Sequence, residues 1–61
     1  MRDPKRIPEV LAVIEEKWKE VPDWRFCQLM SNFFSWYGRD PFYTEDKKFV
    51  EKFKEYFEKS I

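Results

Sequence analysis

Apolar residues recur at helical spacing in three separate stretches of the chain. In the first stretch they fall within about a 100° arc at 100° per residue, which is typical of an amphipathic helix. They are Ile7, Val10, Leu11, Ile14, Trp18 and Val21. Asp3-Pro4 has the form of an N-cap followed by a first-turn proline, whereas Pro8 would interrupt a regular first turn. We therefore predict a helix over residues 4–20 that starts near Pro4 with a distorted first turn.

Proline and glycine mark the limits of the second stretch. Pro22 disfavours helical backbone at the residue before it, Asp23 is a natural N-cap, and Gly38 is typical of a left-handed helix end. The middle of the apolar arc consists of Phe26, Met30, Phe33 and Tyr37, with Cys27, Leu29, Phe34 and Trp36 on its flanks. This arc covers about half the helix surface. The pattern predicts a helix over residues 24–37 that is central and touches both neighbours.

The third stretch follows a loop that contains Pro41. Thr44 is the expected N-cap, and Glu45-Asp46 complement the positive end of the helix dipole. The apolar positions are Phe49, Phe53, Tyr56 and Phe57, with Val50 on the flank. They predict a helix over residues 45–59, and no segment alternates with the period of a strand. The expected fold is one all-α domain, a compact three-helix arrangement over residues 1–61.

The residue types in the chain exclude several function classes. The sequence of 61 residues has no histidine, one cysteine and one glycine. A disulfide framework, a zinc finger, histidine-based catalysis and a glycine-rich phosphate loop are therefore excluded. We expect a protein that is not an enzyme and that holds no metal or cofactor. Cys27 is expected to be a reduced thiol packed among apolar residues.

The expected location follows from two features of the sequence. No stretch approaches the roughly 20 apolar residues that a membrane span requires. Four of the first six residues are charged and they lead into an amphipathic segment, which is unlike a signal peptide. These features predict a cytoplasmic protein without membrane contact.

Aromatic residues are more numerous than a core of this size needs. Of 13 aromatic residues, Trp24 falls on the polar side of its helix and Trp36 at the margin of the apolar arc. Phe42 and Tyr43 lie in the following loop. One placement makes Trp24, Phe42 and Tyr43 lids over the ends of the core, and the other exposes them. The second placement predicts a protein interface, for a partner or for self-association as a homodimer. Its candidate residues are Trp24, Arg25, Trp36, Arg39, Phe42 and Tyr43.

Nucleic-acid binding is the alternative function. Lys48, Lys52 and Lys59 share one flank of the third helix, as a phosphate-binding surface would require. However, 12 basic residues are balanced by 12 acidic ones, and residues 44–61 carry five of each. Glutamates also line the outer face of the third helix, where they would repel phosphate. We therefore expect a protein partner in preference to nucleic acid.

The order of several motifs is similar to that of a known group of proteins. Met1-Arg2-Asp3-Pro4-x-Arg6-Ile7 is followed by Trp18, Pro22-Asp23-x-Arg25, Gln28-Leu29 and Phe42-Tyr43-x-Glu45-Asp46. This order resembles that of small uncharacterised proteins of bacteria and their phages, and more loosely that of the YihD proteins. The resemblance covers nearly the whole chain and implies a compact helical cytosolic protein, with no activity to carry over. A phage or mobile-element protein that acts on a host protein is the corresponding expectation.

Overall fold

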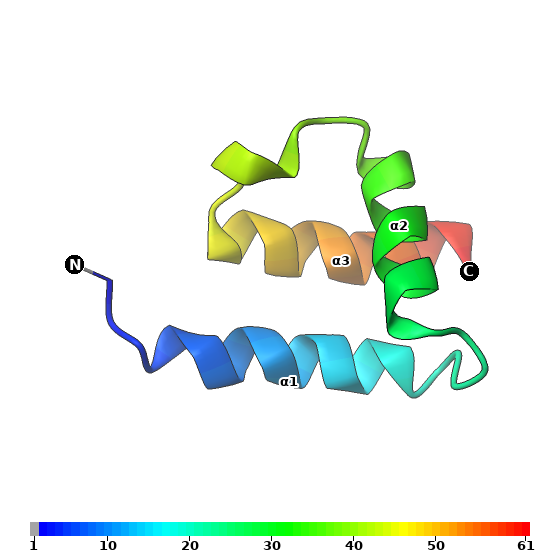
Figure 1. Ribbon diagram of the computed structural model, residues 1–61, viewed down its shortest axis with the longest axis horizontal. Coiled ribbons are helices and arrows are strands. Elements are labelled where there is room, and N and C mark those ends of the chain that lie inside the picture. Colours follow the sequence, from blue (N-terminus) through cyan, green and yellow to red (C-terminus); the bar gives the residue numbers. More distant parts are fainter. Residues whose placement is uncertain (1) are drawn as a thin grey trace.

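The computed structural model describes residues 2–61, which form three α-helices and one short 3₁₀ helix. The elements are α1 (Arg6–Trp18), α2 (Phe26–Tyr37), η1 (Pro41–Tyr43) and α3 (Asp46–Ser60). α1 and α3 lie side by side and run in the same direction, while α2 crosses α3 steeply (Figure 1). The predicted all-α three-helix fold is confirmed. Met1, which begins the motif described above, lies outside the described residues.

The first helix starts later than the predicted range 4–20. The Asp3 carboxylate accepts a hydrogen bond from the Lys5 amide at 2.9 Å, which forms a turn ahead of the helix. The Arg6 amide bonds to the Asp3 carbonyl at 3.2 Å, an i→i+3 contact that is tighter than a regular helical turn. Pro8 then lies in the first turn of α1, where the helix needs no backbone donor from it. The first turn is therefore distorted as predicted, but the regular helix begins beyond Pro4.

The connection from α1 to α2 differs from the expected N-cap at Asp23. The Trp24 amide bonds to the Val21 carbonyl at 3.0 Å, so Asp23 lies inside a turn and caps nothing. Arg25 is the N-cap instead, with extended backbone, and its amide donates to Gln28 Oε1 at 2.8 Å. This is half of a capping box, and it delays the start of α2 by two residues relative to the predicted range.

The segment before α3 also differs from prediction. Thr44 was expected to cap the helix, but its hydroxyl lies 2.8 Å from the Tyr37 hydroxyl and ties the segment to α2. Glu45 is the N-cap by its extended backbone and has no side-chain capping bond. The loop itself contains η1, whose first turn is held by a hydrogen bond from the Phe42 amide to the Asp40 carboxylate at 3.0 Å. α3 matches its predicted range within one residue at each end.

The buried core is formed by α2 and α3. Phe33 is 1% exposed and stands at the centre of an aromatic cluster. Its ring centroid lies 5.1 Å from Phe53, 5.4 Å from Phe49 and 5.9 Å from Tyr56. The buried residues are Leu29, Phe33, Phe53, Tyr56 and Phe57, of which the first three are fully buried. Burial raises the pKa of the Tyr56 hydroxyl. Aromatic rings therefore supply most of the apolar area that stabilises this domain.

Two expectations about the core are wrong. α3, not α2, makes the more extensive contacts with the other two helices, and α1 contributes no buried residue. α2 does touch both neighbours as predicted, since the Phe26 and Trp18 ring centroids lie 5.6 Å apart. The core meets the Leu29 side of α2, and on the opposite flank Phe34 is only partly buried. Cys27 is exposed instead of packed, and Phe26 is 46% exposed. The apolar half of α2 was wider than the surface that α3 covers, so periodicity alone could not identify the buried side.

Gly38 ends α2 as predicted, and it supplies a sensitive test of the turn. Its φ of 72° is left-handed, and its amide bonds to the Phe34 carbonyl at 3.1 Å. A Cβ at this position would make only an ordinary van der Waals contact, with the Trp36 carbonyl oxygen at 3.9 Å. The strain of Gly38→Ala is then purely conformational, about 1 kcal/mol of lost unfolding free energy. Urea denaturation measures it, with Ser31→Ala on the exposed face of α2 as the control. No loss for Gly38→Ala would contradict the left-handed turn.

Candidate interaction surfaces

Phe42 and Tyr43 form an exposed aromatic pair on η1. Each side chain is 81% exposed, and the two ring centroids lie 4.9 Å apart in an edge-to-face arrangement. The Asp40 carboxylate holds the start of the turn, and the Thr44 amide donates to the Pro41 carbonyl at 3.0 Å. The pair therefore lies on a fixed backbone and does not cover the core. Of the two placements left open by the sequence, the exposed one is correct for these residues.

The two candidate tryptophans lie elsewhere and are partly buried against the core. The Trp24 carbonyl accepts a hydrogen bond from Trp18 Nε1 at 2.7 Å, which closes the end of the core next to α1. The lid placement is therefore correct for Trp24. Trp36 contacts the core rings, with its centroid 5.4 Å from that of Tyr56.

The six candidate interface residues do not form one continuous surface. Trp24 and Arg25 lie at the start of α2, whereas Arg39 and the η1 pair follow its end. α2 has 12 residues and is therefore about 18 Å long. Arg25 and Arg39 are exposed near opposite ends of the helix, and Phe42 and Tyr43 lie on a separate element, η1.

A hollow of about 340 Å³ opens between the end of α2 and the middle of α3. It is lined by Arg39, a candidate interface residue, and by Lys48 and Lys52, two of the three lysines considered for nucleic-acid binding. The lining residues are Trp36, Tyr37, Arg39, Lys48, Lys52 and Glu55. From the sequence, Trp36 and Arg39 belong to the protein-interface hypothesis, and Lys48 and Lys52 to the nucleic-acid hypothesis. The crossing of α2 over α3 brings the two pairs together.

Glu55 organises the lysines on this side of α3. It accepts hydrogen bonds from Lys52 and Lys59, each at 3.1 Å. These two bonds lower the pKa of the Glu55 carboxyl below its ordinary value, the Lys52 bond more strongly. Lys59 is thereby held on the far side of Glu55 and does not line the hollow. The three lysines therefore do not act as one row of free cations.

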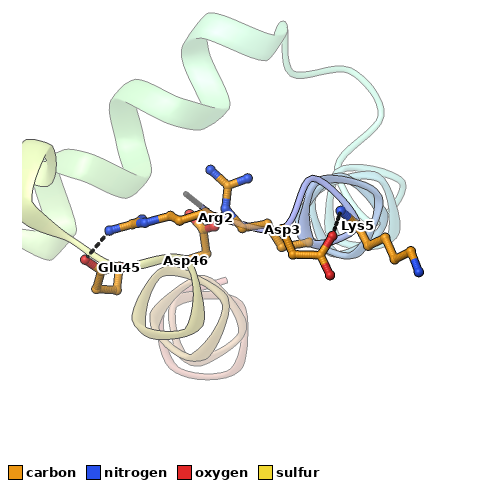
Figure 2. Close-up of polar contacts among 6 residues, drawn as sticks. Arg2, Asp3, Lys5, Glu45 and Asp46 are labelled. Carbon is orange, nitrogen blue, oxygen red and sulfur yellow. Dashed lines mark hydrogen bonds and ion pairs between the residues drawn. The ribbon is translucent and has the colours of Figure 1, made fainter.

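A larger groove of about 780 Å³ lies between the N-terminal halves of α1 and α3. Its apolar floor is made by Val10, Val13 and Val50. Two ion pairs connect its walls: Arg2 with Glu45 at 2.7 Å, and Arg6 with Asp46 at 2.8 Å. Figure 2 shows Arg2 reaching from the N-terminal segment to Glu45, with Asp46 beside it. Arg2 and Glu45 are well exposed to solvent, so their pair contributes little to stability, whereas Arg6 and Asp46 are half-buried, with side chains 38% and 41% exposed.

Sequence reasoning missed this groove. Val10 belongs to the predicted apolar arc of the first helix and Val50 to the flank of the third, whereas Val13 lies in no predicted arc. Glu45-Asp46 were interpreted only as partners of the helix dipole. The available signal was the small size of the valines, because short side chains leave space where two helices lie side by side. On the other face of α1, Ile7 and Leu11 remain 47% and 58% exposed. Both line a small hollow of about 130 Å³. Another hollow, of about 250 Å³, is walled partly by Ile14 and Phe34.

Two further observations concern membranes and metals. Within residues 2–61, no helix has the length and apolar character needed to cross a membrane. The same residues contain no group of three or more cysteine, aspartate or glutamate side chains arranged to hold a metal ion. Comparison of the chain with known protein families, with curated proteins and with solved structures finds no match.

Proposed function

We propose that this chain is a small, non-enzymatic protein-binding module that uses Phe42 and Tyr43 as its main contact residues. The observation that supports the proposal is the 81% exposure of both rings on a hydrogen-bonded turn. Leaving two large aromatic side chains in water costs favourable burial energy, which a partner surface would recover. Because the turn is already ordered, binding would require little further loss of backbone entropy.

The partner classes follow from the same proposal. The sequence resemblance to small bacterial and phage proteins makes a host protein the first class to test, and a second copy of this chain is the other. We also propose a cytoplasmic location, since a single cysteine cannot form the intrachain disulfide that is common in small secreted domains.

Binding of nucleic acid by the lysines of α3 has weaker support. Two of its three candidate lysines, Lys52 and Lys59, already donate to Glu55. Glu51 and Glu58 lie exposed on the same helix and would repel a duplex. Retention on duplex DNA with a steep salt dependence would favour this rival over a protein partner.

The test of the proposed function replaces both exposed rings with serine, Phe42→Ser and Tyr43→Ser together. Helical content and melting temperature should change little, because exposed substitutions usually alter the unfolding free energy by less than about 0.5 kcal/mol. Binding should weaken by on the order of 10³-fold, since two hot-spot aromatics contribute about 2 kcal/mol each. Capture of partners from a bacterial lysate and light scattering of the purified chain measure hetero-association and self-association.

Ile61→Ser is the matched control, because it removes another exposed apolar side chain far along the sequence from η1. It should leave every association intact. If the double variant captured the same proteins and formed the same oligomers as the parent chain, the proposed function would be wrong.

A further inference from the structure

The hollow at the end of α2 concentrates positive charge in a chain that is neutral overall. Arg39 approaches from the segment after α2, and Lys48 and Lys52 occupy successive turns of α3. Residues four apart on a helix share a face, so the two lysines repel each other and favour an anion between them. Three cationic side chains thus face one carboxylate, that of Glu55.

Two of these cations are not engaged elsewhere. Within residues 2–61, neither Arg39 nor Lys48 forms an ion pair, and both side chains are exposed. Lys52 differs, because Glu55 holds it at 3.1 Å. An entering anion would therefore meet a free guanidinium and a free ammonium without breaking an existing pair. Guanidinium and ammonium groups together are a common phosphate-binding set.

The remaining wall of the hollow is aromatic and rigid. The Trp36 ring is partly buried and held by its contacts with Tyr56 and Phe33, at centroid distances of 5.4 and 6.1 Å. Tyr37 is fixed by the hydrogen bond between its hydroxyl and that of Thr44. Immobile aromatic rings beside cationic groups suit a planar ring that carries a negative charge, because the ring stacks while the charge is paired.

We propose that this hollow binds a phosphate group attached to a planar ring, as in a nucleotide. Arg39 and Lys48 bind the phosphate, and Trp36 provides the surface on which the ring stacks. The volume of about 340 Å³ lies within the range of small-molecule sites. The ligand is either a free nucleotide or one unit of a single-stranded nucleic acid, and both present the same chemistry. This site is separate from Phe42 and Tyr43, so it does not depend on the proposed protein-binding function.

The experiment titrates the isotope-labelled full chain with adenosine monophosphate, inorganic phosphate or adenosine, and follows amide and indole resonances by NMR. Adenosine monophosphate should shift the amides of Arg39 and Lys48 and the indole of Trp36, and it should bind about tenfold or more tightly than either fragment. Equal binding of phosphate would contradict stacking, and equal binding of adenosine would contradict the phosphate site. The absence of localised shifts would overturn the proposal altogether.

Two double variants, each of which removes two positive charges, test which cationic side chains bind the phosphate. Arg39→Gln with Lys48→Gln should raise the Kd by about tenfold or more, because both phosphate contacts are lost. Lys47→Gln with Lys54→Gln removes the same charge from exposed positions outside the hollow and should change the Kd less than about twofold. Equal effects of the two pairs would mean a nonspecific charge effect and would overturn the site.

A short oligothymidylate distinguishes the two sources of the ligand. Tighter binding than thymidine monophosphate, with the same shifted residues, assigns the hollow to single-stranded nucleic acid. Equal binding with the same shifted residues assigns it to a free nucleotide. Both results support the site, whereas shifts that avoid Arg39, Lys48 and Trp36 would contradict it.

Discussion

Phe33→Ala should leave the chain largely unfolded. Phe33 is 1% exposed, and its ring lies within 6.1 Å of those of Phe53, Phe49, Tyr56 and Trp36. Removing such a ring typically costs about 3–5 kcal/mol, from lost burial and from the cavity left behind. A single core in a domain of this size rarely supplies more than about 3–5 kcal/mol in total. Far-ultraviolet circular dichroism and thermal melting measure the loss.

Phe42→Ala is the matched control, since it removes the same ring from an exposed position. We expect it to change the unfolding free energy by less than about 0.5 kcal/mol. A cooperative, nearly unchanged melt for Phe33→Ala would show that the aromatic cluster does not hold α2 on α3.

Leu29→Ala should be the second severe substitution. Leu29 is 0% exposed and lies on the side of α2 that meets α3. Truncation of a buried leucine costs about 2–5 kcal/mol, with the larger values where the surroundings cannot collapse into the space. Rigid aromatic neighbours collapse poorly, so we expect a value in the upper part of that range. Urea denaturation, followed by circular dichroism at several protein concentrations, gives the free energy.

Leu11→Ala removes the same atoms from α1, where the side chain is 58% exposed. Its cost should be within about 0.5 kcal/mol of zero, because little burial is lost and alanine favours a helix. If Leu11→Ala cost as much as Leu29→Ala, the apolar side of α1 would be covered in solution. An unfolding midpoint that rises with protein concentration would then show that a second copy of the chain covers this side of α1.

The candidate surfaces were only partly predictable. The sequence indicated Phe42 and Tyr43 because they lie in a loop between two amphipathic stretches, outside any apolar arc. It could not distinguish exposed rings from lids, because that depends on where the loop backbone turns. Trp24 is a lid, because its carbonyl accepts a hydrogen bond from Trp18 and its side chain packs against the core. The groove between α1 and α3 and the hollow between α2 and α3 are lined by residues far apart in the sequence, so neither produces a local sequence pattern.

The three α-helices, their approximate limits and the aromatic character of the core could be predicted from the amino-acid sequence. These properties are local: the 3.6-residue period, the backbone restriction imposed by proline and the left-handed freedom of Gly38 act over a few neighbouring residues. The packing of the helices, in contrast, makes α3 central, leaves Cys27 exposed and brings the Thr44 hydroxyl to Tyr37 instead of the start of α3. Each of these outcomes depends on which apolar surface another helix covers. Because α2 crosses α3 and leaves one of its flanks open, burial follows the packing of the helices and not the pattern along any one of them.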